Sequence, residues 1–319
     1  KIWKEDKYYL IVGNKNDQQV GQVILFSSIN LKEWKFETIL ASNDTNKIGS
    51  MWECPDFFPL ADKRVLICSP QNMKADPLEF HNGNNSVYFI GEYDNVSYRF
   101  EKEAPHTLDY GFDFYAPQTT LLPDGRRIMI AWMKSWDACV MPEGQDWQGM
   151  MTIPRELKLK DGRIWQTPIH ELERYRRNPC RYENELISGW TMLDGVDGRV
   201  IDLIVTLEGG NYTSFAMDIA ADEEYKTSFS YSREKGILEI DRTFCGVTHD
   251  VVCIRKVKIL AEELSCMRFV LDRQSIELFI NDGQQVVTTA ISTPLEAKEI
   301  RFFADGELQI RVEKYDIVV

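Results

Sequence analysis

The chain has 319 residues, 44% of them apolar and 12% aromatic, which is enough to bury a large core without disulfides or metals. Fifty acidic residues against 37 basic ones give a net charge of −13, which argues against a nucleic-acid backbone as partner. No stretch approaches the roughly 18 to 20 uninterrupted apolar residues of a membrane helix, so we expect no membrane partner.

The first half of the chain is a series of short strand patterns bounded by Gly, Asn, Asp or Pro. They fall into three groups, each about 40 to 55 residues long, the size of one four-stranded propeller blade. The groups run from KYYLIVGNK to WKFETIL, from CPDFFPL to SYRFEKE, and from FYAPQTTLL to GRIWQTP. Asp124-Gly125 and Asp161-Gly162 predict tight hairpin turns. The first group is one strand short, and an irregular set of antiparallel sheets fits the same spacing, so this pattern leaves both architectures open.

Residues 168–180 differ in composition from the strand patterns on either side. They are charged, and Ile169, Leu172 and Tyr175 follow helical spacing until Pro179, which predicts a linker with a short helix. Beyond it, residues 181–319 contain about ten short alternating strands, typical of a β-sandwich. We therefore predict an all-β chain in which residues 1–167 form part of a propeller and residues 181–319 form the sandwich.

Cysteine and histidine give no metal signal. The seven cysteines lack CxxC spacing, and the four histidines lie far apart without an HExxH pattern. We expect reduced, mostly buried thiols, as in an intracellular protein, and no metal or other cofactor.

Five motifs occur in one order across nearly the whole chain: MWECPDFFPL, DYGFDFYAPQTT, RRIMIAWMKSW, GMMTIPRELKL and MRFVLDRQSIELFINDGQQVVTTAI. With them the chain resembles glycoside hydrolase family 32, the β-fructofuranosidases, and most of all its bacterial sucrose-6-phosphate hydrolases and invertases. The resemblance implies a five-bladed propeller that carries the active site, followed by a β-sandwich. It also implies a retaining glycosidase that cleaves terminal β-D-fructofuranosyl bonds of sucrose, sucrose 6-phosphate or short fructans in the bacterial cytoplasm.

Two motifs of that family do not occur in the 319 residues. An NDPNG-like motif carries the family's nucleophilic aspartate and an RDP motif carries a second aspartate, and neither is present. We therefore expect a family member cut within its second blade region, with about three blades, no nucleophile, and its targeting region out of view. Such a chain is expected to be inactive alone. The alternative is a non-catalytic fragment that binds carbohydrate or pairs with another chain, either a second copy or the missing N-terminal fragment, because an open propeller exposes strand edges.

The resemblance assigns the acid/base role to Glu53. Aromatic neighbours such as Trp52 disfavour the charged form of a carboxyl group, which suits a residue that donates a proton. We expect Cys54 to form a weak hydrogen bond with the carboxyl group, and Asp56 to anchor the loop that carries it. An exposed glutamate at a strand end is the alternative.

Further substrate-binding residues are expected after the second group of strands. Asp113 suits an acceptor for sugar hydroxyls, with a turn aspartate that caps a backbone amide as the alternative. Tyr115 is expected to reach the carboxyl group of Glu53. Trp52 and Trp136 complete the substrate-binding set, because an indole offers a flat apolar face to a sugar ring.

Three cations and two residues of a family motif complete the candidates. Arg126, Arg127 and Lys134 lie in the region where a phosphorylated substrate would need a cation. Arg155 and Glu156 resemble a family motif that pairs the blade with the linker.

Overall fold

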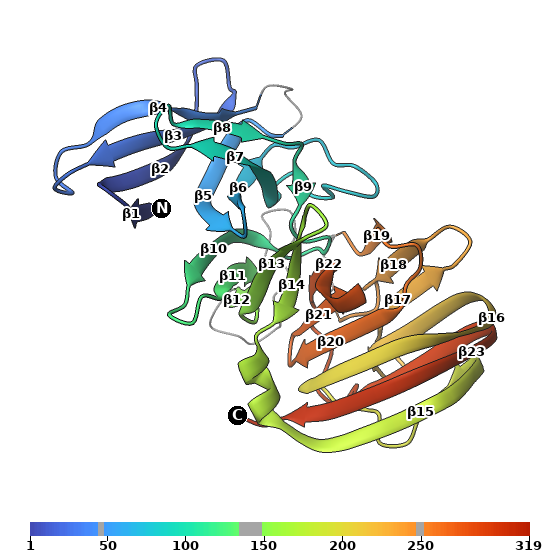
Figure 1. The fold of residues 1–319 in the computed structure, drawn as a ribbon. Coiled ribbons are helices and arrows are strands. Elements are labelled where there is room, and N and C mark those ends of the chain that lie inside the picture. The colour runs from blue at the N-terminus through green and yellow to red at the C-terminus, as the bar shows by residue number, and fades with distance from the viewer. Residues whose placement is uncertain (44–47, 134–148, 247–251) are drawn as a thin grey trace.

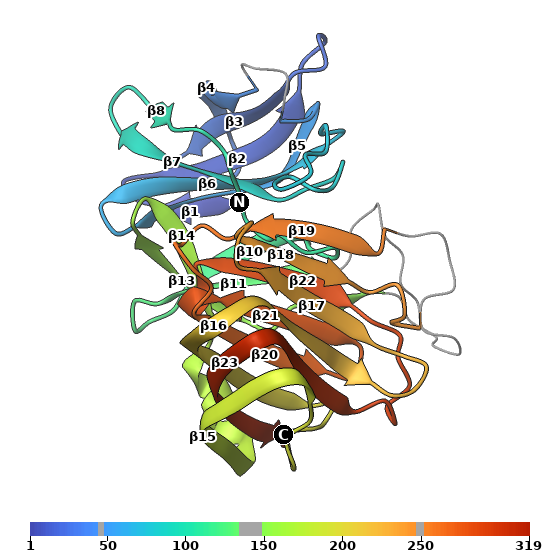
Figure 2. The same cartoon turned by 90° about the vertical axis from the view of Figure 1, so that its right-hand side faces the viewer.

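Three small antiparallel sheets follow one another along the first 168 residues, and one large folded sheet makes up most of the rest (Figures 1 and 2). The computed structural model describes residues 1–43, 48–133, 149–246 and 252–319. The first sheet contains β1 (Ile2–Lys4), β2 (Tyr8–Lys15), β3 (Gly21–Ser28) and β4 (Lys35–Ser42). The second contains β5 (Met51–Leu60), β6 (Lys63–Gln71), β7 (Val87–Asp94), β8 (Arg99–Lys102) and β9 (His106–Thr107). The third contains β10 (Tyr115–Leu121), β11 (Arg127–Met133), β12 (Met150–Met151), β13 (Arg155–Lys160) and β14 (Arg163–Pro168).

Each pair of successive sheets buries its own apolar cluster. One cluster joins the first and second sheets through residues such as Val23, Leu25 and Leu66, and another joins the second and third through residues such as Ile67 and Met129. Twisted sheets that bury their faces only against their neighbours are the principle of a propeller. The predicted all-β, propeller-like half is confirmed, and the number of blades stays a prediction.

Local sequence explains several of these elements. Asp161 and Gly162 join β13 to β14 with φ of 52° and 68°, so both central residues have the positive φ that a two-residue type I′ hairpin turn requires. The Asp-Gly prediction is thus confirmed at this turn. The expected shortage of one strand in the first sheet is wrong, because Ile2–Lys4 pairs with β2 as a fourth strand.

The second half of the chain is a β-sandwich made from one continuous nine-stranded sheet. A 3₁₀ helix, η1 (His170–Tyr175), precedes it, and a second, η2 (Asn281–Gly283), lies within it. The strands are β15 (Arg176–Thr191), β16 (Ile201–Ala221), β17 (Thr227–Ser232), β18 (Ile237–Asp241), β19 (Ile254–Lys258), β20 (Cys266–Asp272), β21 (Ser275–Ile280), β22 (Gln285–Ala290) and β23 (Glu299–Ile317).

Long strands let one sheet serve as both layers. The first part of β16 pairs with β20 and its last part pairs with β17, while β23 follows it along almost its whole length. A register shift between Leu207 and Gly209 marks the bend between the two parts. The two layers enclose a single large apolar cluster. The predicted linker at 168–180 overlaps the sandwich, because β15 already pairs with β23 from Arg176 onward.

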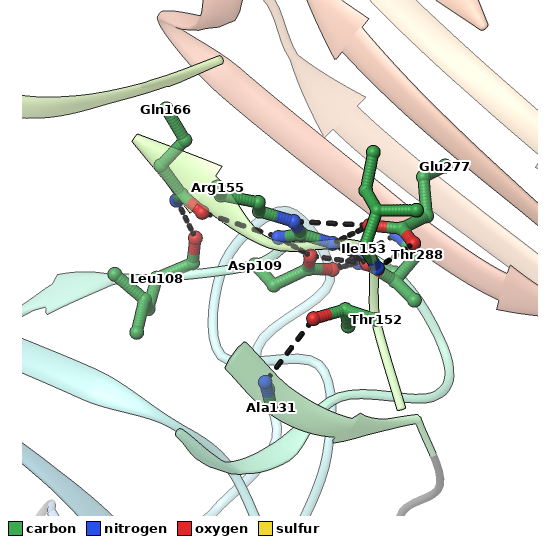
Figure 3. A network of polar contacts seen from close by, with 10 residues as sticks. Leu108, Asp109, Ala131, Thr152, Ile153, Arg155, Gln166, Glu277 and Thr288 are labelled. Carbon is green, nitrogen blue, oxygen red and sulfur yellow. Dashed lines mark hydrogen bonds and ion pairs between the residues drawn. The ribbon is translucent and has the colours of Figure 1, made fainter. Parts of the chain in front are cut away.

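A buried arginine joins the third sheet to the sandwich (Figure 3). Arg155 has no exposed surface, and its guanidinium donates to Asp109 Oδ2 at 2.9 Å and to Glu277 Oε2 at 2.6 and 3.0 Å. It also donates to Gln166 Oε1 at 3.1 Å and Thr288 Oγ1 at 2.6 Å. These contacts use all five N–H groups of the side chain, as a buried guanidinium requires.

A short extended segment completes the same interface. The backbone N–H groups of Tyr110 and Phe112 donate to the carbonyl oxygens of Val286 and Thr288 at 2.8 and 2.9 Å. A side chain at Gly111 would place its Cβ 2.0 Å from the carbonyl oxygen of Thr288, so only glycine permits this approach. Residues 110–112 therefore pair with β22, the strand at one end of the sandwich sheet.

We predict that Arg155→Ala lowers the free energy of unfolding by about 3–5 kcal/mol, because Asp109 and Glu277 would remain buried without their cation. Urea unfolding followed by tryptophan fluorescence measures the change. The control is Arg174→Ala, at an exposed position of η1, which should stay within about 0.5 kcal/mol of the parent chain. Equal changes in the free energy of unfolding for the two substitutions would show that the buried ion pairs of Arg155 do not hold the two halves together.

Candidate active site

Glu53 lies on β5 immediately before a β-bulge. It pairs with Ser69 of β6, whereas Asp56 pairs with Ile67, so the two residues between them, Cys54 and Pro55, oppose one residue of the partner strand. Cys54 has a φ of +48°, a conformation that few side chains adopt. Bulges bend a strand and re-aim its side chains, and they are frequent beside active sites.

Strand β10 of the third sheet, which contacts β5, contains a similar bulge. Tyr115 pairs with Trp132 and Gln118 with Ile130, so Ala116 and Pro117 form a second bulge, in which Ala116 has a φ of +52°. Both bulges are an Xaa-Pro step, which directly follows Glu53 in β5 and Tyr115 in β10.

The two bulged strands bring together the groups around the Glu53 carboxylate. Tyr115 Oη and Gln71 Nε2 both donate to Glu53 Oε2, each at 2.8 Å. Burial raises the pKa of Tyr115, and its hydrogen bond to Glu53 raises that pKa further, so the phenol remains a proton donor at neutral pH. Among the described residues, Glu53 Oε1 has no hydrogen-bonding partner, and the side chain is partly buried. One carboxylate oxygen is thus held by two neutral donors, while the other is left for a ligand.

Two further contacts fix β5 against β10. The fully buried Asp56 accepts hydrogen bonds at Oδ2 from the backbone N–H of Thr119 at 2.7 Å and from its hydroxyl at 2.8 Å. Gln118 Nε2 donates to the carbonyl oxygen of Cys54 at 2.9 Å. Asp56 therefore joins the two strands beside Glu53.

Trp52 does not present a face to a substrate. It is fully buried, its indole N–H donates to the carbonyl oxygen of Ile48 at 2.6 Å, and its ring centroid lies 5.2 Å from that of Phe89. Adjacent strand residues point to opposite faces, so the position that aims Glu53 at the site sends Trp52 into the core between the first two sheets. The expected substrate contact is replaced by core packing.

Asp113 also lies elsewhere. Its side chain is 1% exposed, and its Oδ2 accepts hydrogen bonds from Arg242 and, at 2.8 Å, from the backbone N–H of Ala290. Both partners belong to the second half of the chain. A carboxylate buried against an arginine is paired because isolation would be costly, so Asp113 joins the two halves and is not an acceptor for sugar hydroxyls here.

The remaining candidates from the sequence are one cysteine, two arginines, and two residues that the structure does not describe. Cys54 is exposed and lies beside Glu53, although the structure shows no hydrogen bond from its thiol to that carboxylate. Arg126 pairs with Glu171 of η1, and Arg127 donates to the Thr119 hydroxyl at 2.9 Å, so both cations are engaged away from Glu53. Trp136 and Lys134 lie outside the described residues.

Gln71 is the member of the site that sequence reasoning missed. Regular pairing counted back from the two-residue turn Ala61-Asp62 would place Asn72 opposite Met51 and turn Gln71 to the other face. The bulge at Cys54 and Pro55 shifts the register by one residue, so Gln71 pairs with Met51, two residues from Glu53 and on the same face. The hairpin pattern therefore misses Gln71 unless the bulge is known.

Two searches of the described residues give negative results. Outside 44–47, 134–148 and 247–251, no three side chains of His, Cys, Asp or Glu are grouped so that they could hold a metal ion. Over the same residues, no helix is long and apolar enough to cross a membrane.

Comparison with known proteins gives matches over both halves of the chain. The profile of the glycosyl hydrolases family 32 N-terminal domain matches residues 1–168, and the profile of the family 32 C-terminal domain matches residues 171–318. The chain is 30% identical to the sucrose-6-phosphate hydrolase of Staphylococcus xylosus and 32% identical to the raffinose invertase of Escherichia coli. These alignments cover 97% and 95% of this chain and 63% of each relative.

Solved structures give the same picture. The β-fructofuranosidase of Bombyx mori superimposes with a TM-score of 0.85 at 28% identity, and a mutant of it has been solved in complex with sucrose. The sucrose-6-phosphate hydrolase of Lactobacillus gasseri gives 0.87 at 25% identity. Each comparison covers 99% of this chain and 65% of the other, so the chain spans slightly less than two thirds of these relatives.

The position of Glu53 beside Cys54 can be tested without any substrate. Loss of water around the thiol raises the pKa of Cys54, and the negative charge of Glu53 raises it further. We predict that Glu53→Gln lowers this pKa, which increases the thiolate fraction at pH 8 and the alkylation rate of Cys54 by roughly two- to fivefold. Mass spectrometry after iodoacetamide treatment follows the Cys54 peptide, with Cys180 as the internal control whose rate should not change. An unchanged Cys54 rate would show that the two side chains are not neighbours in solution.

Proposed function

Because the chain belongs to glycosyl hydrolases family 32, we propose that it supplies the acid/base part of an active site that hydrolyses terminal β-D-fructofuranosyl bonds with retention. The observation that carries the proposal is the Glu53 carboxylate, partly buried, with one oxygen held by Tyr115 and Gln71 and the other without a partner among the described residues. A proton donor needs a fixed orientation and one free oxygen, and this geometry provides both.

The reaction then uses Glu53 twice. In the first step, protonated Glu53 gives its proton to the leaving oxygen as a nucleophilic carboxylate attacks the anomeric carbon and the glycosidic bond breaks. In the second, the Glu53 carboxylate takes a proton from water, whose oxygen attacks the anomeric carbon and releases the nucleophile. Tyr115 and Gln71 donate hydrogen bonds to the anionic form that exists between these steps, so they stabilise the carboxylate after it has lost its proton.

No carboxyl group among the described residues forms a hydrogen bond with Glu53, so none of them is proposed for the second carboxyl role. Retention requires two carboxyl groups roughly 5 to 5.5 Å apart. The hydrogen-bonding partners of Glu53 among the described residues are an amide and a phenol, and the 319 residues contain neither an NDPNG nor an RDP motif. We infer that the nucleophile lies outside this chain, so that these 319 residues hold the acid/base alone.

The relatives support a substrate class for this proposal. Sucrose-6-phosphate hydrolases and a raffinose invertase are among the proteins similar to this chain, which supports a terminal β-fructofuranoside such as sucrose or its 6-phosphate as substrate. Arg126 and Arg127 are engaged with other side chains, so neither favours a phosphorylated substrate.

We predict that the 319-residue chain alone releases no fructose from sucrose or sucrose 6-phosphate, because the nucleophile is missing. Addition of a family segment that carries the NDPNG and RDP motifs should produce turnover if the two pieces associate. An enzymatic fructose assay, with size-exclusion chromatography to establish association, measures both. Turnover by the chain alone would refute the inference about the nucleophile, and an associated but inactive pair would contradict the proposed activity.

In the active assembly, Glu53→Gln should lower kcat by about 100- to 10,000-fold, since an amide cannot donate or accept the required proton. The melting temperature should change little, because Glu53 is only partly buried. Glu101→Gln, an exposed position on β8, is the matched control and should keep full activity. Retained activity in Glu53→Gln would remove this residue from the mechanism.

A further inference from the structure

The sandwich contains a cavity of about 450 Å³ that does not involve any residue around Glu53. It is lined by side chains from three neighbouring strands, the residue after β15 and the segment before β17, namely Trp190, Thr191, Met192, Asp218, Lys226 and Arg301. The strands are β15, β23 and β16, which pair in that order in the sandwich sheet (Figure 2).

One wall of the cavity is apolar and exposed. Trp190 and Met192 each keep 57% of their surface accessible, a high value for side chains of this size in a well-packed sheet. Trp190 pairs with Phe303 of β23, and the two ring centroids lie 5.2 Å apart. The indole is thus supported from the side by a second ring and keeps much of its surface free for a ligand.

The opposite side of the cavity is polar, and its side chains are held by hydrogen bonds. Asp218 of β16 is only 3% exposed, although it lines the cavity, and it accepts hydrogen bonds from Lys226 Nζ at 3.1 Å and Ser228 Oγ at 2.5 Å. The β16–β23 register places Asp218 directly opposite Arg301. Arg301 in turn donates to Glu299 Oε2 at 2.9 Å and to the carbonyl oxygen of Asp222 at 2.8 Å.

The charges of this cavity are balanced. Lys226 is paired with Asp218, and Arg301 is paired with Glu299, so two cations face two carboxylates. Both cations are already neutralised by a carboxylate, so an anionic ligand such as phosphate would gain little attraction and would lie close to Asp218 and Glu299. A neutral polyol avoids that cost, because each hydroxyl group both donates to a carboxylate and accepts from an ammonium or guanidinium group.

We propose that this cavity binds one ring of a neutral saccharide, with the apolar face of the sugar on Trp190 and its hydroxyl groups on Asp218, Lys226 and Arg301. An exposed aromatic ring beside a few convergent polar groups is the composition expected of such a site. The site is separate from the proposed chemistry at Glu53, so its occupation does not depend on turnover.

Binding is tested in the Glu53→Gln chain, in which no substrate can be consumed. Sucrose, 1-kestose and maltotriose are titrated separately, up to about 50 mM because an open site of this kind is expected to bind with a Kd on the order of 1 mM. The readout is the Trp190 indole N–H signal in a ¹H–¹⁵N spectrum, assigned from its loss in Trp190→Ala. We expect this signal to shift with at least one sugar, and the sugar that gives the largest shift distinguishes a fructan from a glucan source.

Two variants locate the binding. Trp190→Ala should weaken the affinity about tenfold, because the stacking surface is lost, as measured from the shifts of backbone signals around Asp218. The matched control, Phe36→Ala on β4, removes another exposed aromatic side chain that packs against a second ring, 54% exposed, and should leave the affinity unchanged. Unfolding curves of both variants establish that they are folded. An unmoved Trp190 signal with all three sugars, or a shift produced by inorganic phosphate and by no sugar, would overturn the proposal.

Discussion

The burial of one guanidinium group decides how the two halves of this molecule sit together. Arg155 is fully buried, and its ionised side chain is tolerable only because it donates five hydrogen bonds to four acceptors from both halves. Burial raises the pKa of Glu277, and the neighbouring guanidinium opposes that shift, so the carboxylate depends on its cation as much as the cation depends on it. Separation of the sandwich from the third sheet would break this arrangement, which makes the sandwich part of the scaffold of the site.

That scaffold reaches Glu53 through the strands of the third sheet. Arg155 opens β13, which pairs with β11, and β11 pairs with β10, the strand that carries Tyr115. Tyr115 then crosses to the second sheet and donates to the Glu53 carboxylate. The same Xaa-Pro bulge in β5 and β10 aims the two side chains at each other. A rigid backbone with a local departure from regular pairing is a common way to hold a reactive group at a fixed orientation.

The contact between the two halves also covers a strand edge of the sandwich. A free strand at the end of a sheet offers unpaired N–H and C=O groups to other chains. Here residues 110–112 bond to β22, and Asp113 pairs with Arg242 next to them. The aspartate that sequence reasoning placed in a sugar site therefore serves to close an edge of the sandwich. Its flanking aromatic residues, Phe112 and Phe114, are buried core side chains and not the walls of a binding pocket.

Strand alternation, turn chemistry and motif order are local properties, and they were enough to predict the all-β class, the strand groups, the Asp-Gly turn at 161–162, the sandwich and the family. The sequence also pointed to Glu53 and to its contact with Tyr115, through the resemblance. The tertiary structure decided which face each side chain takes: Trp52 enters the core, Asp113 meets Arg242, and Gln71 joins Glu53. Those outcomes depend on sheet packing and strand register between residues up to 129 positions apart, and no local pattern encodes which of two strand faces will meet another sheet.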